Sequence, residues 1–389
     1  MSFNQKKILM GESLPLGSML QVGSHYYAQY FIKEGSTVFW LSTRNILGYI
    51  ENIFTKKDGY KELGEIWKRK YKWINKNSFA CSFLTFLPYA RRIINPLFPW
   101  IAKNYLRFSF PNFKKILIKN KFQEVDILWI SHPLMISLLK IIKYKILVYR
   151  IADNIEGFKH IPPSIKVIEK ELISRADIVF TTAESLCEKA KKYNSKVYYL
   201  PNAVDYEHFA RFKGKEPEEY QFINSPRIIY VGSLSEWIDV SILKKIALKL
   251  PNFSLVLIGP VEIGLSCLKD FPNVFVLGKR SFKDISNYLK YADVGIIPFK
   301  DNLLTNSIHP LKLYEYFAAG LPVVSRDLEE IRKTNSPAFL AKGRETFIEM
   351  IVQAYQKGKN KERYYEFARE NSWDERFKLV EQYVLRKLN

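Results

Sequence analysis

The sequence has few cysteines, no long apolar run and fewer acidic than basic residues. Cys81, Cys187 and Cys267 are the three cysteines among 389 residues, and their wide spacing excludes a disulfide scaffold and a cysteine-based zinc cluster. No stretch of 18 apolar residues occurs, which excludes an ordinary transmembrane helix. The first residues also lack the apolar core of a signal peptide. We therefore expect a protein of the reducing cytoplasm.

Two common phosphate-binding motifs are missing as well. No GxGxxG fingerprint follows an expected strand, and Gly17 and Gly23 have the wrong spacing for one. The sequence also has no P-loop. A nicotinamide-dependent dehydrogenase and a nucleoside triphosphatase are therefore disfavoured. Nothing in the sequence resembles a cluster of metal ligands, so we expect neither a metal nor a cofactor.

The excess of basic residues points to an anionic partner. Sixty lysines and arginines face 39 acidic residues, giving a formal charge of +21. A soluble enzyme with this charge is expected to meet nucleic acid, an anionic membrane face or phosphorylated ligands.

Much of the charge lies in residues 51–122. Sixteen lysines and arginines stand there against three acids after Glu51, interleaved with aromatic residues such as Trp67, Trp100 and Phe108. Three interpretations are open: a helical excursion whose rings pack into the core, a segment that lies in an anionic membrane interface, or a platform for single-stranded nucleic acid. We favour the membrane interface over nucleic acid, because no recognisable nucleic-acid module surrounds the segment.

Apart from this segment, short apolar runs alternate with segments of helical spacing. Such alternation is typical of parallel sheets covered by helices. It starts near Lys7 and again near Arg227, which predicts an α/β protein of two Rossmann-like domains facing across a cleft, over residues 1–205 and 206–370. The expected strands are 7–10, 37–41, 127–130, 146–149, 178–181, 197–200, one from 227, 255–260, 274–278, 294–299 and 322–325. The expected helices include 25–33, 133–142, 164–174 and 184–193.

The segment Thr305–Val324 has the clearest chemistry. Ser307 is placed to cap a helix, and Pro310 suits its first turn. The N–H groups of a first helical turn, with the helix dipole, bind anions. Lys312 lies one turn in and is suited to a diphosphate. Glu315 follows on the same face, where a carboxylate accepts hydrogen bonds from both hydroxyls of a ribose.

This segment resembles the signature of GT-B glycosyltransferases, and the resemblance extends over nearly the whole chain. Residues 200–205 are similar to the family's hinge motif, and residues 229–233 to the first strand and turn of its C-terminal domain. Residues 292–298 are similar to the strand before the donor loop. Ser372-Trp-Asp374 resembles the start of a helix, here 371–389, that crosses back to the first domain. The matched signature residues are Pro310, Lys312, Glu315, Tyr316, Ala318, Gly320, Pro322, Val323 and Val324.

The resemblance implies a nucleotide-sugar site in the second domain. Ser307 stands where retaining family-4 enzymes carry a glutamate, and no cation follows the first strand of the second domain. The pattern is closer to exopolysaccharide glucuronosyltransferases and teichuronic-acid-type transferases, in which an aspartate of the first domain is the base of an inverting reaction. Lys279 and Arg280 are either contacts to the leaving diphosphate or a solvated pair. The expected donor-binding residues are Gly232, Ser233, Lys279, Arg280, Ser307, His309, Pro310, Leu311, Lys312 and Glu315.

The matching base is Asp153, which follows an expected buried strand. It is alternatively a turn or cap aspartate, and Arg150, Asn154, Glu156 and His132 are nearby candidates. For the acceptor we expect contacts from Gly17, Gly23, His25 and His132. The two glycines serve either close approach to a phosphate or simple turns, and His132 is either a cleft residue or a structural one.

The sequence thus predicts a UDP-sugar-dependent hexosyl- or uronosyltransferase. Its expected acceptor is a lipid-linked or polysaccharide glycan at the inner face of the cell membrane, with no nucleic-acid partner. Three other classes stay open: a retaining GT-B enzyme with a soluble acceptor, a two-lobed small-molecule binding protein, and an enzyme that acts on nucleic acid.

Overall fold

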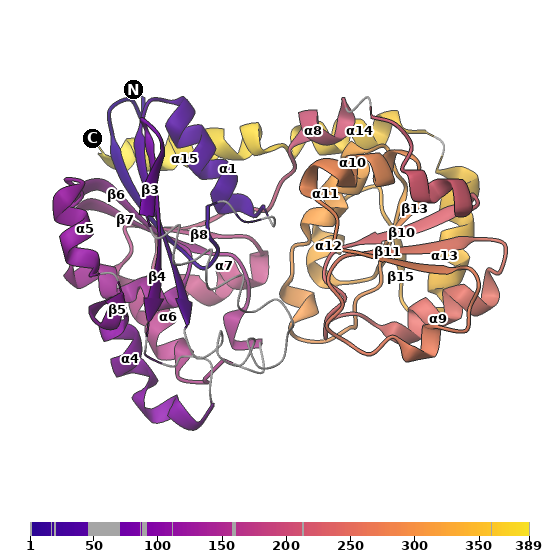
Figure 1. Ribbon diagram of the computed structural model, residues 1–389, viewed down its shortest axis with the longest axis horizontal. Coiled ribbons are helices and arrows are strands. Elements are labelled where there is room, and N and C mark those ends of the chain that lie inside the picture. Colours follow the sequence, from indigo (N-terminus) through magenta and orange to yellow (C-terminus); the bar gives the residue numbers. More distant parts are fainter. Residues whose placement is uncertain are drawn as a thin grey trace. The chain divides into compact units, whose positions relative to one another are not determined.

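The chain divides into two compact units (Figure 1). The computed structural model describes residues 2–388 except 17, 19–20, 46–70, 86, 88–91, 111, 158–160, 212–213 and 359. Unit 1 comprises Met1–Pro201 and Phe377–Asn389, and unit 2 comprises Asn202–Arg376. The chain therefore leaves unit 1 after residue 201 and returns to it at residue 377.

Unit 1 is built on a sheet that has nine strands within the described residues, ordered β3-β4-β2-β1-β6-β7-β8-β9, with β5 pairing to β4. Its pairs are parallel except β3–β4 and β4–β5. The central strands are apolar on both faces, as helices on both sides require. The strands are β1 (Lys7–Glu12), β2 (Thr37–Asn45), β3 (Tyr71–Asn75), β4 (Ser78–Thr85), β5 (Ser109–Phe110), β6 (Glu124–Ile130), β7 (Lys143–Ile151), β8 (Ile178–Thr181) and β9 (Val197–Tyr199).

Helices and 3₁₀ helices connect these strands. The helix expected over 133–142 is instead the 3₁₀ helix η3, whose Pro133 lies in its first turn. The α-helices are α1 (Gly23–Lys33), α4 (Phe98–Asn104), α5 (Phe113–Lys119), α6 (Ile165–Arg175), α7 (Glu184–Lys191) and α15 (Trp373–Leu388), which begins in unit 2. The 3₁₀ helices are η1 (Arg92–Leu97), η2 (Tyr105–Phe108), η3 (Pro133–Lys140) and η4 (Ile155–Gly157).

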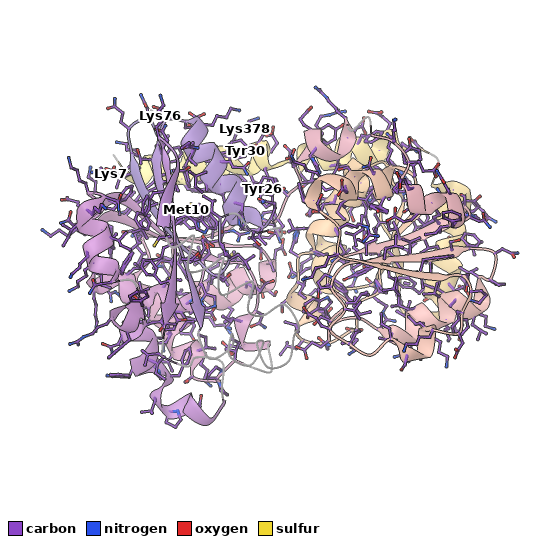
Figure 2. All side chains as sticks on the ribbon, in the orientation of Figure 1. Lys7, Met10, Tyr26, Tyr30, Lys76 and Lys378 are labelled. Atoms are coloured by element: carbon purple, nitrogen blue, oxygen red, sulfur yellow. The ribbon has the colours of Figure 1, made fainter. Side chains whose placement is uncertain are left out.

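Helix α15 completes the core of unit 1. The Phe377 ring stacks on Tyr30 of α1 with centroids 4.9 Å apart, and contacts Phe3 and Phe31 at 5.6 and 5.4 Å. Figure 2 shows Tyr30 and Lys378 in the same part of this unit. A helix that is distant in sequence therefore covers one face of the sheet.

The described part of the basic aromatic segment is not wholly helical, so one of the three open interpretations, a helical excursion, does not hold there as stated. Its described part contains the β3–β4 pair as well as α4 and α5, while residues 51–70 lie outside the described part of the chain. Many of its rings belong to the core; other side chains are exposed, including Trp100 at 54%. The buried rings are Phe79, Phe83, Phe98, Tyr105, Phe113 and Phe122. Core packing thus accounts for part of the aromatic content.

Unit 2 has a parallel sheet of six strands in its described residues, ordered β12-β11-β10-β13-β14-β15. β15 was not expected, because three residues carry little periodicity. The prediction of an α/β protein with two parallel-sheet domains is confirmed. The strands are β10 (Arg227–Val231), β11 (Ser254–Ile258), β12 (Val274–Gly278), β13 (Val294–Ile297), β14 (Val323–Arg326) and β15 (Phe339–Ala341).

Helices pack on the unit 2 sheet around a second core, in which Tyr230, Tyr316 and Phe317 are fully buried. No helix among the described residues of either unit is long and apolar enough to cross a membrane. The helices of unit 2 are α8 (Tyr206–Ala210), α9 (Val240–Lys249), α10 (Phe282–Lys290), α11 (Leu311–Ala318), α12 (Glu329–Lys333), α13 (Arg344–Lys357), α14 (Glu362–Glu370) and the 3₁₀ helices η5 (Glu218–Phe222), η6 (Ser266–Leu268) and η7 (Thr305–Ser307).

Both sheets have a topological switch point. In unit 1 the strand order reverses between β1 and β6, and in unit 2 between β10 and β13. Ligands of such sheets bind in the crevice beyond the carboxyl ends of the strands at that point. Each unit therefore offers one place where a site is expected.

Candidate active site

In unit 2 the helix with the expected donor residues starts later than the sequence indicated. Pro310 is the N-cap of α11, and Leu311 is its first residue. Ser307 does not cap this helix: it lies in η7, and its hydroxyl donates to the Leu303 carbonyl at 3.0 Å. A proline disfavours helical backbone in the residue before it, which separates η7 from α11.

Lys312 lies in the first turn of α11, close to the end of β10. Its Nζ is 5.1 Å from the ring centre of Tyr230 and 5.0 Å from that of Phe299. A Cβ on Gly232, whose φ is +142°, would lie 3.1 Å from the same Nζ. Burial lowers the pKa of Lys312, while the nearby Glu315 raises it. Glycine at 232 therefore leaves room for the ammonium at the switch point.

Ser233 adds an unused polar group beside this lysine. Its Oγ is buried and has no hydrogen-bond partner among the residues that the structure describes. Its carbonyl accepts from the Tyr230 hydroxyl at 2.9 Å. Buried hydroxyls are normally paired, so the Ser233 hydroxyl at the end of β10 has an unused hydrogen-bonding capacity.

Glu315 completes this side of unit 2. Burial raises the pKa of its carboxyl, and Lys312 counters that effect. The two side chains lie three positions apart on α11, and each favours the charged form of the other. Together with the N–H groups of the first helical turn, the pair can accept an anion on one end and a hydroxyl donor on the other.

Tyr316, the next motif residue, has a structural role. Its hydroxyl accepts the Val231 N–H at 2.8 Å, and its ring covers Gly295, where a Cβ would lie only 2.4 Å from the Tyr316 ring. These contacts fix α11 against β10 and β13.

Other expected donor residues are engaged within the protein. The His309 ring is buried, and its Nε2 shares a hydrogen bond with the Tyr314 hydroxyl at 3.0 Å; burial lowers its pKa to about 3. Arg280 pairs with Glu219 at 2.7 Å and donates to Tyr288, whereas Lys279 is exposed. The donor roles of His309, Lys279 and Arg280 stay predictions, and the geometry favours a structural role for Arg280.

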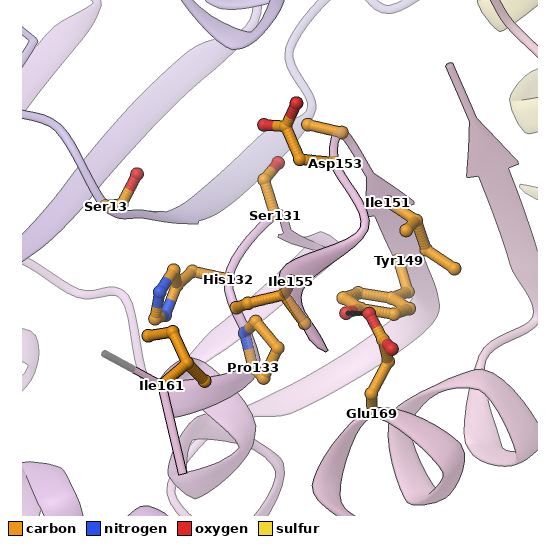
Figure 3. A pocket seen from close by; sticks show the side chains of 11 residues that line it. Ser13, Ser131, His132, Pro133, Tyr149, Ile151, Asp153, Ile155, Ile161 and Glu169 are labelled. Carbon is orange, nitrogen blue, oxygen red and sulfur yellow. Dashed lines mark hydrogen bonds between the residues drawn. The ribbon is translucent and has the colours of Figure 1, made fainter. Parts of the chain in front are cut away.

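In unit 1 a pocket of about 230 Å³ lies beyond the ends of β1, β6 and β7 (Figure 3). The switch point between β1 and β6 contributes Ser13 and Ser131 to it. Its lining residues are Ser13, Ser131, His132, Pro133, Tyr149, Ile151, Ala152, Asp153, Ile155, Ile161 and Glu169.

Asp153 lies in this pocket, two residues past β7. Desolvation by the surrounding protein raises the pKa of its carboxyl, and the charge of Arg150 lowers it. The residue as a whole keeps exposed surface, so a ligand can approach it. A raised pKa makes a carboxylate a better proton acceptor.

His132 also lines the pocket, but it caps a helix. Its Nδ1 accepts the Leu134 N–H at 3.2 Å, and burial lowers its pKa to about 4. The ring is therefore neutral at physiological pH and is a weak base. The geometry supports the structural interpretation of His132, with its ring still able to contact a ligand.

Two further acceptor candidates do not line this pocket. The Nδ1 of His25 accepts the Val22 N–H at 3.2 Å, its Nε2 bonds to the Pro15 carbonyl at 3.0 Å, and its ring packs at a tilt against Trp40. Gly23 is the first residue of α1. These contacts favour structural roles for both residues, because they fix the start of α1. Gly17 lies outside the described residues.

A row of polar side chains at the carboxyl ends of β1 and β6 was not predicted from the sequence. Glu12 is buried and accepts from the Ser131 hydroxyl at 2.8 Å, and Ser131 also contacts Ser24. Burial raises the pKa of Glu12 to about 7, and its hydrogen bonds and Arg150 oppose that rise. The position of Ser131 directly after an apolar run was the available signal. No cluster of metal-binding side chains occurs in the described parts of either unit.

Residues 225–357, which include Lys312 and Glu315, match the family described as Glycosyl transferases group 1. Residues 225–357 are thus similar to a glycosyltransferase group 1 domain, and the chain as a whole has the GT-B fold. The predicted fold is thereby confirmed, and the activity, the acceptor, the donor and the stereochemistry are addressed below as proposals.

A curated relative is the putative teichuronic acid biosynthesis glycosyltransferase TuaH of Bacillus subtilis. It is 29% identical over 183 residues, which make up 44% of this chain and 46% of TuaH, so the match spans about half the length of either protein.

Solved structures of the GT-B fold match almost the whole chain at low identity. Sucrose-phosphate synthase of Thermosynechococcus elongatus gives a TM-score of 0.70 at 13% identity and covers 97% of this chain and 98% of its own. HepE of Anabaena, in complex with UDP and glucose, gives 0.64 at 14% identity, with 98% and 100% covered. These likenesses concern the fold alone.

Proposed function

We propose that this GT-B protein transfers a hexosyl or uronosyl group from a nucleotide-diphosphate sugar to a glycan acceptor in cell-surface glycan synthesis. The observation that carries the proposal is the arrangement at the start of α11. Lys312, the unpartnered hydroxyl of Ser233 and the first-turn N–H groups converge at a switch point. This combination suits a diphosphate, and Glu315 suits the ribose hydroxyls.

The donor we propose is a UDP-sugar. HepE is described in complex with UDP-glucose, and trehalose-6-phosphate synthase of E. coli with UDP-2-fluoro glucose. The proposal includes no cofactor besides this co-substrate, because Lys312 and the dipole of α11 can offset the charge of the leaving diphosphate.

The reaction we propose is an inverting displacement with Asp153 as the base. The acceptor hydroxyl attacks the anomeric carbon while its proton passes to the Asp153 carboxylate. The bond from the anomeric carbon to the diphosphate oxygen breaks, and the electron pair leaves with the nucleoside diphosphate. An α-linked donor then gives a β-linked product.

We further propose a lipid-linked acceptor and a peripheral position on the inner face of the cell membrane. The name of TuaH, a protein of teichuronic acid synthesis, supports a cell-surface glycan. Trp100 and Phe108, with ring centres 6.0 Å apart, are exposed together with Leu97 and Phe110. Arg107 is exposed beside Phe108 in the chain. Exposed rings beside cationic side chains are typical of surfaces that bind anionic lipid.

Product analysis tests the proposed reaction. The full chain is incubated with UDP-sugars and a lipid-diphosphate acceptor, and the products are analysed by mass spectrometry and NMR. We expect glycosyl transfer with release of UDP. Failure of every UDP-sugar to bind or to turn over would remove the proposed donor class, and an α-linked product from an α-linked donor would exclude inversion.

Flotation with liposomes tests the membrane part separately. We expect the protein to float with anionic vesicles and to be released as salt rises. Replacing Trp100 and Phe108 with serine is expected to weaken flotation. The control is Phe222→Ser in unit 2, where an 82% exposed ring lies far along the chain from the basic segment. Equal flotation of the two variants would refute a membrane role for the Trp100 patch.

A further inference from the structure

The pocket of unit 1 has a carboxyl group at each end. Figure 3 shows Asp153 at one end and Glu169, from α6, at the other. Glu169 is 4% exposed, and its Oε1 accepts from the Tyr149 hydroxyl at 3.4 Å. The proposed reaction uses Asp153 but gives Glu169 no role. A buried carboxyl group in the wall of a binding pocket therefore needs an explanation.

The charge around Glu169 is not fully balanced. Lys189 of α7 lies 3.5 Å from Glu169, but it also pairs with Glu156 at 2.5 Å. The single ammonium group of Lys189 is thus shared between the carboxyl groups of Glu156 and Glu169. Among the described residues, no lysine or arginine lines the pocket, and the lining His132 is neutral at physiological pH because burial lowers its pKa to about 4.

The hydrogen-bonding capacity of the pocket follows from this lining. Carboxylate oxygens accept hydrogen bonds, whereas sugar hydroxyls and amines donate them. A ligand carboxylate would place acceptor against acceptor and one negative charge beside another next to the buried Glu169. The pocket volume of about 230 Å³ lies below the range of sites for drug-sized ligands, so it suits a single sugar ring.

We infer that this pocket takes a neutral or amino sugar as the acceptor residue and rejects uronic acids, with Glu169 as the specificity-determining residue. The inference rests on the proposed function and narrows it to an acceptor class. Asp153 receives the proton of the reacting hydroxyl, and Glu169 accepts a hydrogen bond from a hydroxyl or amino group on the far side of the ring.

Ligand-observed NMR on the full chain tests this inference without the donor. The probes are methyl β-glucoside, methyl β-glucosaminide and methyl β-glucuronide, which share one ring scaffold and differ in charge. We expect the glucoside and the glucosaminide to bind about tenfold or more tightly than the glucuronide. Glu169→Gln is expected to reduce that ratio by about tenfold, because glutamine removes the charge and can donate to a carboxylate.

The matched control is Glu171→Gln on the same helix. Glu171 pairs with Lys103 at 2.7 Å and does not line the pocket, so the ratio is expected to stay unchanged. If Glu169→Gln does not fold, the ratio of glucoside to glucuronide affinity in the unaltered protein still tests the predicted specificity. Equal or tighter binding of the glucuronide, or no binding of any probe, would overturn the inference. Because no donor is present, a failure of glycosyl transfer is scored separately.

Discussion

The two units use one sheet topology for opposite chemistry. The parallel strands of each sheet reverse their order once, between β1 and β6 in unit 1 and between β10 and β13 in unit 2. At that point unit 2 presents Lys312 and the start of a helix, whereas unit 1 presents the carboxyl groups of Asp153 and Glu169. The topology thus decides where a ligand binds, and the few residues after each strand decide which charge it carries.

The largest effect is expected from Asp153→Asn, which tests whether unit 1 supplies the base while unit 2 binds the donor. Removing a general base typically costs about 10²–10⁴-fold in rate. We expect a loss of that size in kcat with little change in the affinity for the nucleotide sugar, because the donor residues belong to unit 2. Steady-state kinetics and calorimetry measure the two quantities. Full activity of the variant would move the base to Glu156 or His132.

The converse change is Lys312→Ala. A charge-assisted hydrogen bond is worth about 1.5–3 kcal/mol, so we expect the affinity for the nucleoside diphosphate to fall by about 10- to 100-fold. Acceptor binding measured by NMR should stay the same. Lys249→Ala is the control, since Lys249 is an exposed lysine at the end of α9 and has no expected role in donor binding. Calorimetry that shows equal affinities for the two variants would contradict the placement of the donor on α11.

The pH dependence of stability probes the buried Glu12. Its pKa is raised to about 7, above its ordinary value of 4.5, because burial disfavours the charged form. A carboxyl with a raised folded-state pKa stabilises the fold below pH 4.5 and loses that contribution as pH rises to about 7. The shift corresponds to about 3 kcal/mol.

Glu12→Gln removes this titration. We therefore expect the difference in the free energy of unfolding, variant minus unaltered protein, to increase as pH rises from 4.5 to 7. Urea titrations at several pH values measure it. Parallel pH profiles for the two proteins would show that Glu12 does not titrate in this range.

The smallest expected effect belongs to Ser233→Ala. A neutral hydrogen bond is worth about 0.5–1.5 kcal/mol, so donor affinity should fall less than in Lys312→Ala. Because the hydroxyl of Ser233 has no partner in the described structure, thermal stability is expected to hold or rise slightly. A clear loss of stability with unchanged donor affinity would assign Ser233 to the fold instead of the ligand.

Much of the fold was predictable because apolar strands leave a local signal. β8 and β12 were placed at their observed bounds, whereas β3, β4 and β5 were missed inside a segment whose charge hid the pattern. The short strand β15 was missed for lack of length.

The candidate site was harder to predict than the fold. The motif spacing led to Lys312 and Glu315, yet it placed the helix start at Ser307, because local sequence does not show where Pro310 turns the chain. Glu169 gave no signal at all. It is one of several acidic residues on an amphipathic helix, and only tertiary packing brings it to the pocket.

The return of the chain to unit 1 has a consequence for synthesis on the ribosome. Unit 2 is continuous in sequence, whereas unit 1 needs residues 377–388, whose Phe377 covers Phe3 and Phe31 and whose Tyr383 stacks on Tyr198 at 3.9 Å. Domains usually fold in the order in which they are translated. Here unit 1 cannot complete its core until the whole of unit 2 and α15 have emerged from the ribosome. Until then, its aromatic surface stays exposed. Unit 2 is therefore expected to become protease-resistant first in nascent chains, and a chain ending at residue 376 should aggregate.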